Sequence, residues 1–303
     1  MHPLDLRFSA TDGRVLAATV HAPASAPRGA LVVLSALGVP RGYYARFAEW
    51  MAARDIAVLT FDYRGVGDSR NGPLRKDPAT RLDWARHDAT RAIDFALDRW
   101  RGVPTWGLGH SFGGQAFGLT PRARDLDGLV VAASGSGDLS LYPPALRRRY
   151  AFLLGTAVPV VNAVAGYVPG FLGIGEDLPA GVVGQWARWC GTPGYARAVL
   201  GRDATHYHRI TAPMRFYDFP DDTFAPLGAA AELRSWYTDA DVVHRTIAPA
   251  DIGLERIGHF GLFRPGPTEA VWGEIAASIL GQTAATEYND MSHSAGSDRE
   301  RSL

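Results

Sequence analysis

Short apolar runs alternate with amphipathic stretches along most of this chain, and that alternation constrains the fold more than any other feature. The segments Ala30–Leu37 and Ile56–Tyr63 are rich in consecutive apolar residues, as expected of strands buried on both faces of a sheet. Between Pro78 and Trp100, apolar side chains recur at three- and four-residue intervals, which is typical of an amphipathic helix. Strands that alternate with helices form parallel sheets with crossover helices on both faces. The pattern therefore predicts an α/β fold.

The same criteria predict further elements on both sides of a long irregular region. The alternation breaks between residues 138 and 204 and then resumes, and the polar, aperiodic tail 282–303 is expected to be disordered. We expect additional strands at Leu4–Ser9, Arg14–His21, Thr105–Leu108, Leu126–Ala133, Pro213–Phe219 and Val242–Ile247, and additional helices at Tyr43–Arg54, Phe112–Leu119, Pro226–Tyr237 and Thr268–Leu280.

One uncharged stretch, Ala151–Gly175, is long enough to be considered as a membrane span. Pro159, Pro169 and several glycines interrupt it, which favours two short apolar helices or a loop instead. We therefore expect no stable membrane insertion. The first seven residues contain an acid and no apolar core, so they do not resemble a signal peptide, and we expect a cytoplasmic protein.

Charge and cysteine content exclude several classes of function. The chain has 31 basic and 31 acidic side chains, whereas nucleic-acid binding requires a basic excess, so no nucleic-acid partner is expected. A single cysteine, Cys190, excludes an internal disulfide and a multi-thiolate metal site. Neither a dinucleotide-binding nor a phosphate-binding glycine motif is present, and no cluster has metal-ligand spacing. We expect no cofactor and no metal, and nothing in the sequence indicates an oligomeric state.

The clearest chemical signal is the segment Gly109-His110-Ser111-Phe112-Gly113, which matches Gly-x-Ser-x-Gly. It follows a predicted strand and opens a predicted helix, the context in which this motif holds a nucleophilic serine on a strained turn. Glycines flank the serine because larger side chains would collide with the neighbouring strand and helix. The N–H groups at the start of the helix face the position where an oxyanion develops. Ser111 is the predicted nucleophile.

A nucleophilic serine needs a base and an orienting acid, which follow it in the order acid, then histidine, on this kind of scaffold. Of nine histidines, His259 lies in a glycine-flanked loop between the last strand and the last helix, where the base is expected. The acid should follow the strand Pro213–Phe219. Both Asp221 and Asp222 occupy that place, and the residues alone leave the choice between them open.

Together these motifs make the chain resemble the α/β-hydrolase superfamily over residues 4–281. The segment Phe61–Ser69 is similar to the Asp-x-Arg-Gly-x-Gly-x-Ser segment after the fourth strand, and the closest branch is that of serine aminopeptidase S33 and monoacylglycerol-lipase-like enzymes. Ser35–Gly38 occupies the place of the family's His-Gly-x-Gly oxyanion loop, although Ser-Ala replaces His-Gly. The resemblance implies an oxyanion hole made by the backbone N–H groups of Leu37 and Phe112. It favours Asp222 as the acid, because Asp222 precedes a proline at the family's Asp-x-x-x-Pro spacing.

The resemblance also offers an explanation for the irregular region between residues 138 and 204. It implies a core of residues 1–137 and 205–281 and a helical cap, 138–204, inserted after the sixth strand. The apolar part of this cap would line an acyl pocket, with Leu154, Val161, Trp186 and Trp189 as candidate substrate-binding residues, although such side chains more often fill a cap's own core. A cap carboxylate, Glu176 or Asp177, would hold the α-amine of a peptide substrate, the alternative being an ordinary surface acid.

The expected activity is hydrolysis of a small-molecule carboxylic ester with a small or medium apolar acyl group, through a Ser-His-Asp triad and an acyl-enzyme. Three alternatives remain open. An acyltransferase would use the same acyl-enzyme, an aminopeptidase-like enzyme would cleave an amide, and a binding protein would keep the fold without the chemistry. The complete set of Ser111, His259 and an acid argues against the last alternative.

Overall fold

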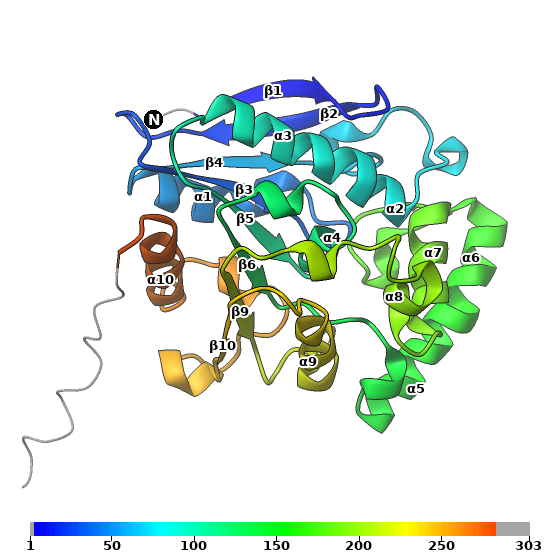
Figure 1. Cartoon of the computed structure of the whole chain (residues 1–303). Helices are drawn as coiled ribbons and strands as arrows, with labels where there is room; N and C mark the ends of the chain where they lie inside the picture. The colour runs from blue at the N-terminus through cyan, green and yellow to red at the C-terminus, as the bar shows by residue number, and fades with distance from the viewer. Residues whose placement is uncertain (1–2, 283–303) are drawn as a thin grey trace, which may run out of the picture.

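The predicted apolar strands join into one eight-stranded sheet in the computed structural model, which describes residues 3–282. Its strand order is β1-β2-β4-β3-β5-β6-β9-β10 (Figure 1). The pairs β1–β2 and β2–β4 are antiparallel, and all the others are parallel. The strands span Leu4–Ser9 (β1), Val15–His21 (β2), Gly29–Leu34 (β3), Ile56–Phe61 (β4), Thr105–His110 (β5), Gly128–Ala132 (β6), Met214–Asp218 (β9) and Val242–Thr246 (β10).

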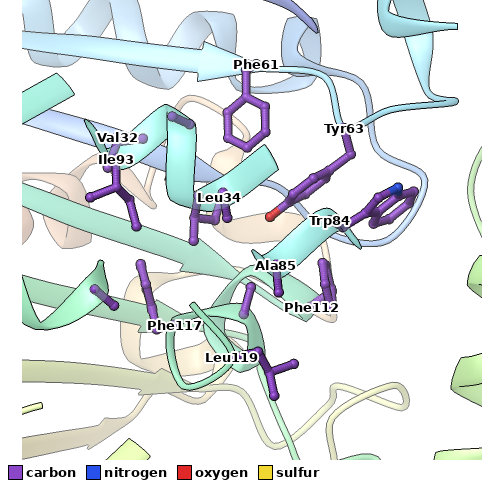
Figure 2. Packing of buried hydrophobic residues seen from close by; sticks show 14 of the residues in the cluster. Val32, Leu34, Phe61, Tyr63, Trp84, Ala85, Ile93, Phe112, Phe117 and Leu119 are labelled. Atoms are coloured by element: carbon purple, nitrogen blue, oxygen red, sulfur yellow. The ribbon is translucent and has the colours of Figure 1, made fainter. Parts of the chain in front are cut away.

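Helices cover both faces of the sheet, which explains the uninterrupted apolar runs (Figure 1). In β3, Val32 and Leu34 belong to one buried cluster, while Leu31 and Val33 belong to another on the opposite face. Figure 2 shows part of the first cluster, in which Val32 and Leu34 lie among side chains of helices. The helices are α1 (Ala45–Ala52) and α10 (Glu269–Ile279) on one face, and α3 (Thr90–Arg99), α4 (Phe112–Phe117) and α9 (Leu227–Ser235) on the other.

The long helix expected at Pro78–Trp100 begins later and is not uniform. Thr80 caps it: the Thr80 hydroxyl accepts the Asp83 N–H at 3.2 Å, and the Asp83 carboxylate accepts the Thr80 N–H at 2.8 Å. The helix then runs as α2 (Arg81–Asp83), a π-helical turn at Trp84–Ala89, and α3. This reciprocal cap fixes Arg81 as the first helical residue.

The segment expected to form a cap lies beyond the carboxyl ends of the central strands (Figure 1). It contains α5 (Pro144–Phe152), a π-helical turn, α6 (Val158–Ala165), a small hairpin of β7 (Tyr167–Val168) and β8 (Leu178–Pro179), α7 (Ala180–Cys190) and α8 (Tyr195–Leu200). Within residues 3–282, no helix has the length and hydropathy needed to cross a bilayer. The two separate short helices expected in the uncharged stretch are not found: α5 continues without a break through the π-helical turn into α6. This helical run ends at a glycine with a left-handed backbone, Gly166. The predicted disordered tail falls almost wholly on residues 283–303, outside the described part.

Candidate active site

Ser111 stands on a sharp turn between β5 and α4, with φ of 55° and ψ of −114°. This is a strained conformation for a residue with a side chain. A Cβ atom on Gly113 would lie 1.9 Å from the Leu34 carbonyl oxygen, and one on Gly109 would lie 2.5 Å from the backbone of Gly113. The motif therefore requires glycine at both positions, as expected from the sequence.

His259 and Asp222 reach Ser111 from two other loops. His259 Nε2 lies 2.8 Å from Ser111 Oγ, and His259 Nδ1 lies 2.7 Å from Asp222 Oδ2. Asp222 follows β9, and His259 lies in the loop between β10 and α10. Both side chains are almost fully buried, so little water competes for these contacts. The structure brings together the three residues that the sequence singled out, in the order acid, imidazole, hydroxyl.

The two neighbouring acids have different contacts. Asp222 Oδ1 accepts two N–H groups of its own loop, which orients Oδ2 toward His259. Asp221 Oδ2 instead accepts the backbone N–H groups of Ile257 and Gly258, both at 2.9 Å. Asp221 thus holds the loop that carries His259, while Asp222 contacts the imidazole itself.

A second buried histidine, which the sequence analysis did not assign a role, connects the same loops. The Ala36 N–H donates to the Tyr44 hydroxyl oxygen at 2.9 Å, Tyr44 Oη lies 2.8 Å from His110 Nδ1, and His110 Nε2 lies 2.8 Å from the His259 carbonyl oxygen. Since a carbonyl only accepts, His110 must carry its proton on Nε2 and accept from Tyr44 at Nδ1. Burial holds the pKa of the His110 imidazole well below its ordinary value, so it stays neutral. Its place beside Ser111 was the only signal available in the sequence.

The two expected oxyanion donors border the serine. Phe112 is the first residue of α4, so its N–H has no partner within that helix. Within the described chain, the Leu37 N–H donates to no backbone carbonyl. Leu37 and Ser111 line the same cleft. Their role as an oxyanion hole stays a prediction.

A cleft of about 550 Å³, including its open mouth, lies over Ser111 and His259. Trp186 of α7 lines it, as expected. The other three candidates are not among its lining residues. Leu154 faces a separate groove between α6 and α7, Val161 is half-buried on α6, and Trp189 is fully buried behind the cleft. The uncharged cap stretch packs mainly against α7, and only its end, at Gly173 and Ile174, reaches the cleft.

The cap carboxylates are occupied by backbone groups. Glu176 accepts the Gly67 N–H at 3.1 Å, and Asp177 accepts the Gly170 N–H at 2.9 Å. Neither residue lines the cleft over Ser111. This arrangement favours the reading of both as structural acids over that of an amine anchor. Among the described residues, no group of three His, Cys, Asp or Glu side chains is placed to hold a metal ion.

Comparison with known proteins agrees with this architecture. The family model of the serine aminopeptidase S33 hydrolases matches residues 25–172. A soluble variant of monoglyceride lipase from Saccharomyces cerevisiae superimposes with a TM-score of 0.67 at 14% identity, covering 92% of this chain and 94% of the lipase. The chain has the fold of the α/β hydrolases. A second α/β hydrolase, a carboxyl esterase from Bacillus coagulans, has a TM-score of 0.62 at 15% identity, covering 93% of this chain and 99% of the esterase.

The predicted resemblance and the predicted fold are thereby confirmed, and the family match supports a serine hydrolase. At such low identities, the structural neighbours share the fold and carry no information about the substrate. No curated protein matches the sequence.

Proposed function

We propose that this α/β hydrolase cleaves carboxylic esters through an acyl-enzyme, with Ser111 as nucleophile, His259 as base and Asp222 as the orienting acid. The observation that carries the proposal is the continuous contact from Asp222 through His259 to Ser111 Oγ, at 2.7 and 2.8 Å, at the bottom of a cleft. A buried triad of this geometry is costly to maintain without a chemical use, which argues against a binding protein.

In the proposed mechanism, Ser111 Oγ attacks the ester carbonyl while His259 Nε2 accepts its proton. Asp222 keeps the other proton on Nδ1 and stabilises the imidazolium that forms. The N–H groups of Leu37 and Phe112 bind the developing oxyanion. His259 then protonates the leaving alcohol, and a water molecule, activated by the same imidazole, releases the acid and regenerates Ser111.

Esters are favoured over aminoacyl amides because no carboxylate of the described residues lines the cleft over Ser111 to hold an α-amine. The two candidate acids, Glu176 and Asp177, are instead held by backbone N–H groups. An acyltransferase would pass through the same acyl-enzyme and differ only in the acceptor that attacks it. Competition between water and an added alcohol therefore separates the two activities.

The test combines covalent labelling with substrate assays. The wild-type enzyme should react with a fluorophosphonate probe and hydrolyse p-nitrophenyl butyrate faster than an aminoacyl arylamide. Ser111→Ala should abolish both labelling and hydrolysis, whereas Ser278→Ala, which removes a serine hydroxyl from the outer helix α10, should change neither. Labelling that persists in Ser111→Ala, or faster cleavage of the arylamide, would contradict the proposal. Product analysis with added methanol would reveal an acyltransferase if the methyl ester dominated.

A further inference from the structure

Arg81 is a buried arginine that faces the cleft over Ser111. It is the first residue of α2 and one of the largest fully buried side chains, with 1% of its surface exposed. It lines the cleft together with Ser111, Gln115 and Trp186. A guanidinium is always charged, so this burial places a positive charge within the wall of the proposed active site.

No carboxylate among the described residues pairs with this charge. Arg81 Nη2 donates to Gln115 Oε1 at 3.1 Å, while Nε and Nη1 have no acceptor within residues 3–282. The nearest acid in the sequence, Asp83, is used by the Thr80 cap. Arg64 shows how this protein neutralises another buried guanidinium, since it contacts Asp88 and Asp12, each at 2.6 Å.

The surroundings of Arg81 hold the guanidinium in a fixed position. Its Cζ lies 4.4 Å from the centroid of the Phe112 ring and 5.6 and 5.7 Å from those of Trp186 and Trp189, at cation–π distances. The indole N–H of Trp189 also lacks an acceptor within the described chain. Three N–H donors of this cluster, Arg81 Nε, Arg81 Nη1 and Trp189 Nε1, therefore have fixed positions but no acceptor within residues 3–282.

Gln115 keeps its oxygen toward the arginine because its amide nitrogen is used elsewhere. Gln115 Nε2 donates to the Gly135 carbonyl at 2.6 Å, and the Tyr195 hydroxyl donates to Gln115 Oε1 at 3.1 Å. Nε and Nη1 of Arg81 are thus left without acceptors within residues 3–282, on opposite sides of the guanidinium. A carboxylate can accept from Nη1 at the end of the guanidinium, the end at which Asp12 accepts from Arg64.

We propose that Arg81 binds a carboxylate carried by the substrate, so that the enzyme acts on half-esters of dicarboxylic acids or related anionic esters. This inference rests on the proposed ester hydrolysis and names its substrate class. It replaces the purely apolar acyl group expected from the sequence with one that ends in a charge. A neutral substrate leaves the buried guanidinium without a counter-charge, whereas an anionic one supplies it at the moment of binding.

The first test compares the monomethyl esters of C4, C5 and C6 dicarboxylic acids with their uncharged amides, such as monomethyl glutarate against methyl glutaramate. These pairs have nearly the same shape and differ in one charge. We expect kcat/KM to favour the charged member of at least one pair by roughly 30-fold or more, the size expected for a buried, hydrogen-bonded ion pair. Arg81→Met should remove that preference and leave the amide ester within a few-fold of wild type. Arg81→Lys should retain part of it.

Arg86→Met is the matched control, since Arg86 is an exposed arginine in the π-helical turn after α2. The Arg86→Met variant should prefer the charged ester over the neutral one as strongly as the wild-type enzyme does. Equal rates for charged and neutral esters in the wild-type enzyme, or an equal loss of both in Arg81→Met with a lowered Tm, would overturn the proposal. The latter result would make Arg81 a structural residue, whereas removal of an unpaired buried charge should leave the Tm unchanged or raise it.

A binding measurement separates this inference from the proposed hydrolysis. In Ser111→Ala, succinate, glutarate or adipate should raise the Tm, and the added Arg81→Met substitution should abolish that rise. If the dicarboxylates bind in this way but no ester is cleaved, the proposed carboxylate site is supported and the proposed hydrolysis is refuted. If esters are cleaved but no dicarboxylate raises the Tm and no charged ester is preferred, the proposed carboxylate site is refuted and the proposed hydrolysis is supported.

Discussion

Replacing Asp222 by Asn tests the proposed geometry most sharply, because Asp221 beside it offers a matched control. Asp222 Oδ1 accepts two backbone N–H groups, at 2.8 and 3.0 Å, and Oδ2 lies 2.7 Å from His259 Nδ1. An asparagine would keep its oxygen on those N–H groups and turn its NH2 group toward Nδ1. His259 would then carry its proton on Nε2, the atom that must accept the Ser111 proton.

This change of tautomer determines how far kcat should fall. We expect kcat to fall about 10⁴-fold in Asp222→Asn, as in other Ser-His-Asp triads, which is about 5 kcal/mol of transition-state stabilisation. Asp221→Asn can still offer its oxygen to the N–H groups of Ile257 and Gly258. It loses only the charge on those bonds, about 1 kcal/mol, so kcat should fall less than about tenfold.

The assay is the steady-state hydrolysis of p-nitrophenyl butyrate, with the Tm of each variant as a control for folding. The ¹⁵N chemical shifts of the His259 ring report its tautomer directly. If Asp222→Asn retains more than about a tenth of the wild-type kcat, or if Asp221→Asn is the more damaged of two folded variants, the assignment of Asp222 as the acid is refuted.

Four further outcomes are expected. Ser111→Ala and His259→Ala should each cost several orders of magnitude in kcat, and the double variant little more, because the triad acts as a unit; losses that multiply would contradict a shared mechanism. In urea unfolding, Gly113→Ala should cost about 3 kcal/mol or more, since its Cβ would overlap a carbonyl oxygen of β3. Gly155→Ala, which meets nothing within 4 Å in a cap helix, should stabilise the protein by about 0.5–1 kcal/mol. Trp186→Ala should shift kcat/KM toward bulkier acyl groups by about 1–3 kcal/mol per added methylene, and an equal change for all acyl groups would exclude Trp186 from the acyl site.

The sequence predicted the sheet well because its strands are buried on both faces and therefore appear as apolar runs. The run Ile56–Tyr63 became β4, Ile56–Phe61, with an error only at the end. Position along the chain also sufficed to predict that Ser111 and His259 lie close together, since each occupies a loop at the same edge of a parallel sheet.

What the sequence could not predict depends on contacts between distant segments. Arg81 begins an amphipathic helix, where an arginine normally faces water, and its burial results from cap aromatics about a hundred residues later. Leu154 and Val161 were expected in the pocket because their segment is apolar. Periodicity identifies the apolar side of a helix but does not show which neighbour covers it, and here α7 lies on that side.

The hydrogen bonds through Tyr44 and His110 run in one direction only. At one end stands the Ala36 amide, which always donates, and at the other the His259 carbonyl, which always accepts. Neither end can supply or absorb a proton, so the donors and acceptors between them cannot be reversed. The centroids of the His110 and His259 rings lie only 5.2 Å apart. Even so, His110 can neither give a proton to the His259 ring nor accept one from it. In the proposed mechanism, the catalytic proton is confined to a single route between the nucleophile, the base and the leaving group.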